Sequence, residues 1–410
     1  MRFLFVHQNF PGQFQYVAKS LADLPEHLVI GIADETNQIN RPPLHSRIRV
    51  ETYRTNWRGS KDTHPYIHSF EHQIRRGQCV AKLALKLKKR GFLPDVVVAH
   101  PAWGEALFLR DIFPDAKHVY YFEYFYRAFG GDVNFDPEFP MDLDAQLGIR
   151  VKNATQLLAL EAADLGISPT NWQKSRYPAE FQDKIKVIHE GINTAIIKPD
   201  VKAKLTFNGL QLTASDEVLT YVARNLEPYR GIHTFLRALP EILRQRPNLH
   251  VLIVGGDGVS YGKPLPAGET YKSRYSAEVS ARIDWSRVHF LGKLAYAQYL
   301  KVLQVSSVHV YLTYPFVLSW SMLEAMASGC VLVASATAPV HEVVVDNVNG
   351  VLVDFFDYEH LAHTVLEALD FRFQEKHISM RFQARQTIVD RFDLDSICLP
   401  KWRDFIFQMS

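Results

Sequence analysis

The chain has 410 residues, of which 47% are hydrophobic and 22% are charged, and its formal net charge is +2. This length exceeds one typical hydrophobic core, so we expect two domains of ordinary size. The small net charge excludes a global field that would attract nucleic acid, and we expect no nucleic-acid partner.

The three cysteines, Cys79, Cys330 and Cys398, lie far apart and form no Cys-x-x-Cys pair. This spacing indicates neither a disulfide framework nor a zinc site, and it favours a reducing compartment. The chain starts with a short apolar strand instead of a signal peptide, and no apolar run of about 18 residues follows. We therefore expect a cytoplasmic protein.

The first predicted elements are a strand from Phe3 to Val6, a loop from His7 to Gly12, and an amphipathic helix. Together they form a β-loop-α unit. Glycine at the tip of such a loop lets a ligand approach the backbone, and the following helix start favours an anion. Gly12 is therefore a candidate binding residue.

Strands and helices then alternate. The predicted elements are strands at Leu28 to Ile32, Ile48 to Tyr53, Val96 to Ala99 and Val119 to Phe122, with a helix from about Ser69 to Arg90. Alternation of this kind predicts an α/β fold with a parallel sheet covered on both faces, whose ligands bind at the carboxyl ends of the strands.

Two polar residues follow these strands. His100 is either a loop residue that caps its own turn or a ligand for a substrate hydroxyl. Glu123 lies among aromatic residues, a setting that favours a functional carboxylate, so both are candidate substrate-binding residues.

The acidic loop after Phe129 contains Asp132 and Asp136, which match the start of a calcium loop. Pro137 stands where that loop needs glycine, and Leu143 stands where it needs a bidentate glutamate. We therefore predict no metal site, and we expect Asp142 and Asp144 to cap the next helix, which the pattern places from Ala145 to Ala163.

Strands at Leu165 to Ser168 and Ile185 to His189 complete the first half, and a linker follows near Lys198. A second series of strands and helices begins at Val218. Arg224 and Arg230 flank the loop after its first strand, where two guanidinium groups can fork onto a diphosphate. Lys293 follows a later strand and is a further candidate contact for a nucleotide.

The segment from Tyr311 to Ser335 predicts strand, loop, helix and strand, with the helix from Ser319 to Ser328 and Gly329 as its left-handed stop. Glu324 is the one acid on an otherwise apolar helix. The helix start offers unpaired N–H groups to a phosphate, and Glu324 lies about 7 Å further along the axis at about 1.5 Å per residue. This is close to a phosphate-to-ribose spacing.

The run from Ser321 to Gly329, Ser-Met-Leu-Glu-Ala-Met-Ala-Ser-Gly, resembles the signature helix of the family 4 retaining glycosyltransferases. The resemblance implies that Glu324 holds the nucleotide ribose. That family carries a second glutamate eight positions earlier, where it meets the donor sugar, and this chain has Phe316 there. Arg230 likewise stands where the family has lysine.

The resemblance covers nearly the whole chain and implies the GT-B fold, with two doubly wound Rossmann-like domains facing across a cleft. Residues 1–197 would form the acceptor-side domain and residues 198–391 the donor domain, with a tail at about 392–410 packing back on the first domain. The implied donor contacts include Phe316, Val317, Leu318 and Ser319.

The implied activity is that of a nucleotide-sugar-dependent hexosyltransferase acting on a glycan, a lipid-linked or a protein acceptor. Preorganised positive groups would stabilise the leaving diphosphate without a metal or another cofactor. Glu123, Arg224 and Arg230 are the predicted catalytic residues. The acceptor proton passes either to the departing phosphate oxygen or to a carboxylate such as Glu123, and the sequence leaves both routes open.

A noncatalytic protein of this fold that binds a nucleotide or a glycan is the alternative, and Phe316 is the residue that favours it. A dinucleotide oxidoreductase is set aside, because no Gly-x-Gly-x-x-Gly follows the first strand.

Lys82, Lys86 and Lys89 share one face of the helix predicted from Ser69 to Arg90. Such a face is either simply solvated or in peripheral contact with an anionic membrane. In the second case the protein would act at the inner face of that membrane.

Overall fold

The computed structural model describes residues 1–39, 41–56, 62–370 and 374–408, and the chain divides into two compact units. Unit 1 comprises Met1–Gly191 and Leu394–Ser410, and unit 2 comprises Ile192–Asp393. The boundaries expected from the sequence differ from these by a few residues. The last two residues of the expected tail lie outside the described residues.

The described part of unit 1 contains a seven-stranded parallel sheet in the order β3-β2-β1-β4-β5-β6-β7. Successive residues of β1 point into different cores, since Leu4 and Val6 join one apolar cluster while Phe3 and Phe5 join another. The strands are β1 (Arg2–Val6), β2 (Leu28–Asp34), β3 (Ile48–Tyr53), β4 (Val96–Ala99), β5 (Lys117–Tyr121), β6 (Leu165–Ser168) and β7 (Ile185–Val187).

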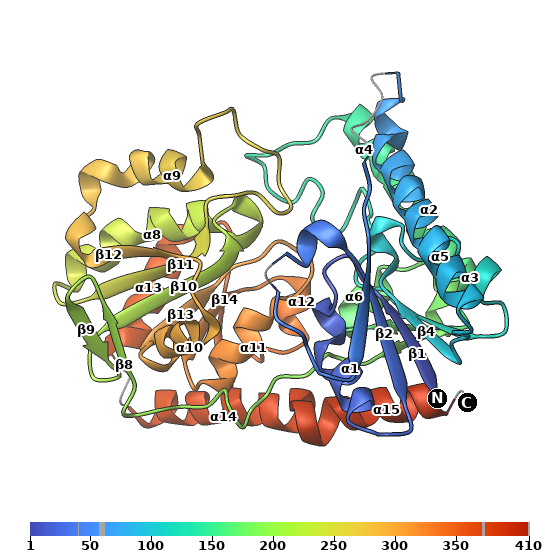
Figure 1. Ribbon diagram of the computed structural model, residues 1–410. Helices are drawn as coiled ribbons and strands as arrows, with labels where there is room; N and C mark the ends of the chain where they lie inside the picture. The colour runs from blue at the N-terminus through green and yellow to red at the C-terminus, as the bar shows by residue number, and fades with distance from the viewer. Residues whose placement is uncertain (40, 57–61, 371–373, 409–410) are drawn as a thin grey trace. The chain divides into compact units, whose positions relative to one another are not determined.

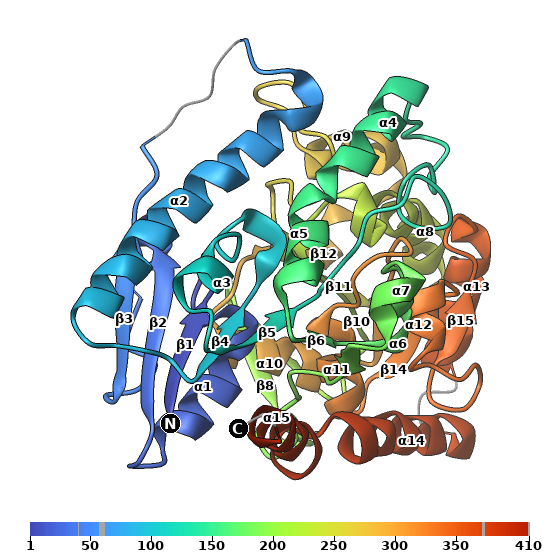
Figure 2. The ribbon, with the colours of Figure 1, turned by 90° about the vertical axis from the view of Figure 1, so that its right-hand side faces the viewer.

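Helices cover both faces of this sheet, as the continuous apolar strands predict. Helices α2, α3 and α5 pack on one face, whereas α1 and α15 pack on the other (Figure 2). The helices of unit 1 are α1 (Gln15–Ala22), α2 (His68–Lys89), α3 (Leu109–Ile112), α4 (Leu143–Lys152), α5 (Ala154–Ala162), α6 (Asn171–Ser175), α7 (Ala179–Gln182) and α15 (Leu399–Phe407).

The prediction of a single helix from Ala145 to Ala163 is wrong, because the structure has two helices there, α4 and α5, separated at Asn153. The Asn153 side chain accepts a hydrogen bond from the Tyr126 N–H at 2.9 Å and donates one to the Tyr126 carbonyl at 2.8 Å. These bonds tie the helix junction to the loop after β5. Asp142 caps α4 as predicted, accepting from the Ala145 N–H at 2.8 Å, whereas Asp144 instead accepts from the Tyr66 hydroxyl.

The described part of unit 2 contains a six-stranded parallel sheet in the order β12-β11-β10-β13-β14-β15, and a separate hairpin of β8 and β9. The strands are β8 (Lys204–Phe207), β9 (Leu210–Thr213), β10 (Val218–Asn225), β11 (His250–Gly256), β12 (Val288–Gly292), β13 (Val308–Tyr311), β14 (Val331–Ser335) and β15 (Val351–Val353).

Helices α10, α11 and α14 share one apolar core of unit 2, and α8 packs beside α13 (Figure 1). The helices of unit 2 are α8 (Ile232–Gln245), α9 (Tyr271–Val279), α10 (Tyr296–Gln304), α11 (Trp320–Ala327), α12 (Ala338–His341), α13 (Tyr358–Asp370) and α14 (Glu375–Phe392). Among the helices of the described residues, none has both the length and the apolar character needed to cross a membrane.

Candidate functional site

The carboxyl edge of the unit 1 sheet carries a chain of side-chain hydrogen bonds. His7, directly after β1, accepts the Asn9 N–H at its Nδ1 (2.9 Å), so its proton lies on Nε2, which donates to Gln13 Oε1 at 2.8 Å. Gln13 Nε2 then donates to Glu123 Oε1 at 2.9 Å. Burial lowers the pKa of His7 well below its ordinary value, so the ring stays neutral in this role.

His100, directly after β4, approaches the same carboxylate from the other oxygen. Its Nδ1 accepts the Ala102 N–H at 3.3 Å, and its Nε2 lies 3.4 Å from Glu123 Oε2. The structure thus brings together the two residues expected to meet the substrate. His100 is 1% exposed, whereas the Glu123 side chain is 28% exposed, so Glu123 is the member that faces outward and His100 supports it.

Gly12, where the close approach of a ligand is expected, makes room for a side chain of the same edge. Its φ is +49°, and a Cβ atom there would lie 2.6 Å from ring atoms of His7. The missing side chain therefore makes room for the imidazole of His7. A ligand contact at Gly12 remains a prediction.

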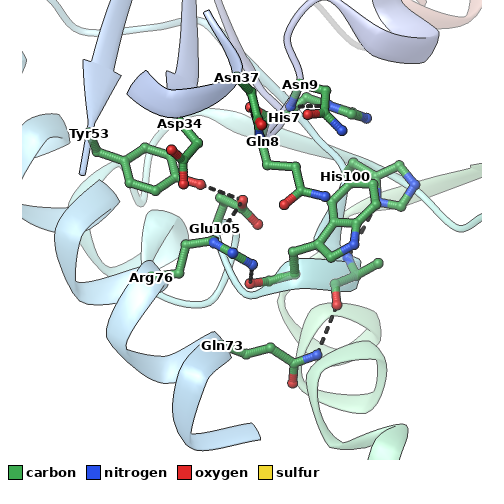
Figure 3. A network of polar contacts seen from close by, with 12 residues as sticks. His7, Gln8, Asn9, Asp34, Asn37, Tyr53, Gln73, Arg76, His100 and Glu105 are labelled. Atoms are coloured by element: carbon green, nitrogen blue, oxygen red, sulfur yellow. Dashed lines mark hydrogen bonds and ion pairs between the residues drawn. The ribbon is translucent and has the colours of Figure 1, made fainter. Parts of the chain in front are cut away.

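A second, deeper layer supports the loop that follows His100 (Figure 3). The carboxyl group of Glu105 is fully buried; it accepts from the Tyr53 hydroxyl at 2.6 Å and lies 3.6 Å from Nε of Arg76. Burial raises the pKa of Glu105, although the nearby Arg76 guanidinium opposes this.

Helix α2 uses this layer to hold the loop in place. Arg76 Nη1 donates to the Trp103 carbonyl at 3.1 Å. Gln73 Nε2 donates to the Ala102 carbonyl at 2.9 Å. The Trp103 indole in turn stacks on the His100 ring, with 4.3 Å between ring centroids. Helix α2 therefore helps to fix the His100 imidazole beside Glu123.

In unit 2, Arg224 and Arg230 occupy different environments. Arg224 is exposed at the end of β10, as expected for a cation that meets an anionic ligand. Arg230 is 7% exposed and donates to the Tyr311 hydroxyl (3.0 Å), the Thr313 hydroxyl (2.7 Å) and the Val317 carbonyl (3.1 Å). The free guanidinium fork expected at Arg230 is therefore absent, because its N–H groups order the loop after β13.

The same loop uses one of the backbone amides that were expected to bind the donor. The Ser319 N–H donates to the Tyr311 hydroxyl at 2.9 Å, so in this structure it already has an acceptor. Contacts from the amides of Val317 and Leu318 remain predictions. Helix α11 follows as predicted, with Ser319 as its N-cap and Gly329 in the left-handed region at φ +76°.

Glu324 lies on α11 and is 9% exposed. Its Oε1 accepts from the Tyr296 hydroxyl at 2.7 Å, and its Oε2 accepts from the Tyr299 hydroxyl at 2.6 Å. Burial raises the pKa of Glu324, and the two hydrogen bonds oppose that rise. Each carboxylate oxygen has a further lone pair, so the two tyrosines orient the acid without exhausting its acceptors.

Lys293 is exposed after β12, and its side chain crosses Gly256 at the end of β11. A Cβ atom on Gly256 would lie 2.6 Å from the Lys293 Cε atom. The glycine therefore allows a cation to lie over the end of the neighbouring strand. A contact between Lys293 and a nucleotide remains a prediction.

Phe316 is 4% exposed and packs within an aromatic cluster. Its ring centroid lies 4.8 Å from that of Tyr261 and 5.5 Å from that of Tyr229. The expected contact between the Phe316 ring and the donor sugar remains a prediction, but this packing leaves little of the ring exposed.

Two residues that organise these edges, Gln13 and Glu227, were not predicted from the sequence. Glu227 is fully buried and accepts the backbone N–H groups of three consecutive residues, Ser260 (2.9 Å), Tyr261 (3.1 Å) and Gly262 (2.9 Å). An acid within the Leu-Glu-Pro segment after a buried strand was the available signal, since a buried carboxylate needs hydrogen-bond donors.

Comparison with known families matches both halves of the chain. Residues 26–197 match the glycosyl transferase family 4 group, and residues 206–387 match the glycosyl transferases group 1 family. The chain is 27% identical over 192 residues to D-inositol 3-phosphate glycosyltransferase of Corynebacterium efficiens, an alignment that covers 46% of this chain and 43% of that protein. The match therefore spans less than half the length of that relative.

An uncharacterized glycosyltransferase of Methanocaldococcus jannaschii is 27% identical over 220 residues, covering 53% of this chain and 52% of that protein. Two solved structures match the whole of both chains at 19% identity: Anabaena HepE in complex with UDP and glucose, with a TM-score of 0.71, and sucrose-phosphate synthase of Thermosynechococcus elongatus, with a TM-score of 0.75. These likenesses confirm the predicted α/β fold of the GT-B type.

Proposed function

Because the chain belongs to the glycosyl transferase family 4 group and to the glycosyl transferases group 1 family, we propose that it is a retaining hexosyltransferase. It would move a sugar from a nucleoside-diphosphate sugar to a hydroxyl of a glycan, a lipid-linked or a protein acceptor. Unit 2 would bind the donor, and Glu123 of unit 1 would meet the acceptor.

One observation carries the donor assignment: the loop before α11 and Glu324 on that helix are both held in place, and they would bind the phosphate and the ribose of the donor. Arg230 fixes the loop that leads into α11, and Tyr296 and Tyr299 fix Glu324 on that helix. A helix start favours an anion, and a carboxylate accepts hydrogen bonds from ribose hydroxyls. Arg224 and Lys293 add exposed positive charge at the ends of β10 and β12.

In the proposed reaction the bond between the anomeric carbon and the diphosphate oxygen breaks, and the acceptor oxygen bonds to that carbon on the same face. Negative charge grows on the leaving diphosphate, where fixed positive groups stabilise it. The acceptor proton passes to the departing phosphate oxygen or to Glu123. The Gln13 amide beside Glu123 holds the carboxylate for this contact, at 2.9 Å.

A thermal-shift panel of nucleoside diphosphates and their sugars, followed by turnover assays, tests this function. UDP and UDP-glucose are the first donors to include, because HepE was solved with UDP and with glucose. Inositol phosphate is a first acceptor, because the relatives are named for it. Binding followed by transfer is expected, and a chain that binds no nucleoside diphosphate would contradict the proposal.

A noncatalytic binding protein is the second candidate, and the burial of the Phe316 ring in place of the family's glutamate favours it. Such a protein would bind a nucleotide or a glycan but catalyse neither transfer nor hydrolysis of any nucleotide sugar in the panel. The same turnover assay therefore separates the two candidates.

Action at the inner face of a membrane is a further proposal. Lys82, Lys86 and Lys89 are exposed on α2, and an electrostatic contact with anionic lipid would use them. Sedimentation with anionic vesicles should show binding that salt weakens and that Lys→Glu changes at these positions abolish. Binding that ignores both would contradict an electrostatic contact.

A further inference from the structure

The loop after β11 is hydrogen-bonded to the segment that follows β10, which leads to Arg230 in the predicted donor site. Asn225, at the end of β10, donates from Nδ2 to the Ser260 hydroxyl at 2.7 Å. Glu227, two residues on, accepts the N–H groups of Ser260, Tyr261 and Gly262. The segment that carries Arg224 and Arg230 thereby also fixes the backbone of Tyr261.

The backbone of this loop is held by a strong set of bonds. A fully buried carboxylate is costly unless donors surround it, and three backbone N–H groups at 2.9 to 3.1 Å compensate for the charge of Glu227. We therefore expect Tyr261 to keep its place in the absence of ligand.

The side chain of Tyr261 covers Phe316 and reaches Arg230. The Tyr261 ring lies 4.8 Å from the Phe316 ring and 5.6 Å from the Arg230 guanidinium carbon. Burial alone would lower the pKa of the Arg230 guanidinium, but the neighbouring Tyr311 and Tyr261 raise it. Tyr261 itself is only partly buried, whereas Phe316 is 4% exposed.

We infer that Tyr261, and not Phe316, is the aromatic residue of unit 2 that selects the donor sugar. This inference rests on the proposed function. A diphosphate bound at the Arg230-ordered loop would place its sugar beside the Tyr261 phenol, which is held at that loop. A phenol offers a neutral donor and acceptor for a sugar hydroxyl and an apolar ring face for sugar C–H groups, without repelling a diphosphate.

The test measures two affinities for each variant, one for a nucleoside diphosphate and one for its sugar. Calorimetry with UDP and UDP-glucose, GDP and GDP-mannose, and ADP and ADP-glucose first identifies the pair that wild type binds. Tyr261→Phe should then weaken the nucleotide sugar about tenfold and the free diphosphate less than about twofold, as expected for one lost hydrogen bond.

Two matched variants separate selection of the sugar from ordering of the loop. Tyr271→Phe removes a hydroxyl that donates to the Lys263 carbonyl at 2.8 Å in the same segment, and it should leave both affinities unchanged. Phe316→Leu changes the buried ring beneath Tyr261, and it should leave the ratio of the two affinities unchanged.

Three outcomes would overturn the inference: no effect of Tyr261→Phe, an equal loss of both affinities, or a larger change of the ratio in Phe316→Leu than in Tyr261→Phe. A wild-type chain that binds none of the diphosphates contradicts the proposed function itself, and the inference falls with it. If wild type binds a diphosphate but Tyr261→Phe leaves the ratio of the two affinities unchanged, only the role of Tyr261 is contradicted and the proposed function stands.

Discussion

At the carboxyl edge of its sheet, unit 1 orients one carboxylate through a chain of side chains, whereas unit 2 uses buried charged side chains to order its loops. His7, Gln13 and Glu123 form a chain that orients one carboxylate. In unit 2, Glu227 and Arg230 instead bond to backbone groups and hydroxyls of neighbouring loops. A substitution in the first network should therefore change chemistry with little loss of structure, while one in the second should change stability and affinity together.

The largest expected effect tests the unit 1 side of this comparison. Glu123→Gln should lower turnover about 100- to 1000-fold, the usual cost of losing a group that positions or accepts a proton, while nucleotide affinity stays within about twofold. Steady-state kinetics and calorimetry measure both quantities. Glu180→Gln, at an exposed acid of the same unit, is the control, and full activity in Glu123→Gln would remove the proposed carboxylate.

The two arginines test the unit 2 side. Arg230→Ala should lower the free energy of unfolding by about 3 kcal/mol, because it leaves buried oxygens without donors, and should weaken diphosphate binding about 10- to 100-fold. Arg224→Ala should weaken binding about tenfold and leave stability unchanged, since its side chain is exposed. Denaturant unfolding and calorimetry separate these outcomes. Unchanged diphosphate affinity in both variants would contradict the donor site.

Acid stability sharpens the comparison, because here the two units should behave alike. Burial lowers the pKa of His189 in unit 1 and of His309 in unit 2 to about 3. Between about pH 6.5 and pH 3 the unfolded chain binds these protons and the folded chain does not, so stability falls as the pH falls. At pH 5 each histidine should cost about 2 kcal/mol.

Thermal unfolding between pH 8 and pH 4 checks this expectation. His309→Gln should reduce the pH dependence, whereas His363→Gln, at an exposed position of unit 2, should not. A wild-type melting temperature that stays constant down to pH 4 would contradict buried neutral imidazoles.

The smallest expected effect is that of a chelator. The proposed leaving-group stabilisation comes from Arg224, Lys293 and the loop ordered by Arg230, so turnover should be unchanged after treatment with EDTA. Loss of activity with recovery in manganese or magnesium would show instead that the charge comes from a metal ion.

Much of the fold could be predicted because strands buried on both faces give continuous apolar runs. The segment from Tyr311 to Ser335 forms the predicted strand, loop, helix and strand, with α11 at Trp320–Ala327 and β14 at Val331–Ser335. The break between α4 and α5 could not be predicted, because it depends on Asn153 meeting a loop distant in sequence. The hairpin of β8 and β9 was not predicted, although its Asn208-Gly209 turn is a strong hairpin signal.

Individual residues of the candidate sites could be named from the sequence, whereas most of their contacts could not. His100 and Glu123 follow strands, and their approach to within 3.4 Å follows from the parallel sheet. The bond from Gln13 to Glu123 joins residues that no local pattern connects. The burial of Arg230 was hidden for the same reason, since its three acceptors come from the end of β13 and from the loop after it.

The return of the chain to unit 1 has a consequence for biosynthesis. Every residue of unit 2 is translated before Leu394–Ser410, so unit 2 can complete its fold on the ribosome while unit 1 still lacks α15. The Met1 amino group lies 3.3 Å from the ring of His27, which in turn lies 5.7 Å from the ring of Phe407. A short linker could therefore join Met1 to the chain that follows Phe407. A circular permutant opened at Ile192 would then carry unit 2 and unit 1 as two uninterrupted segments, in that order.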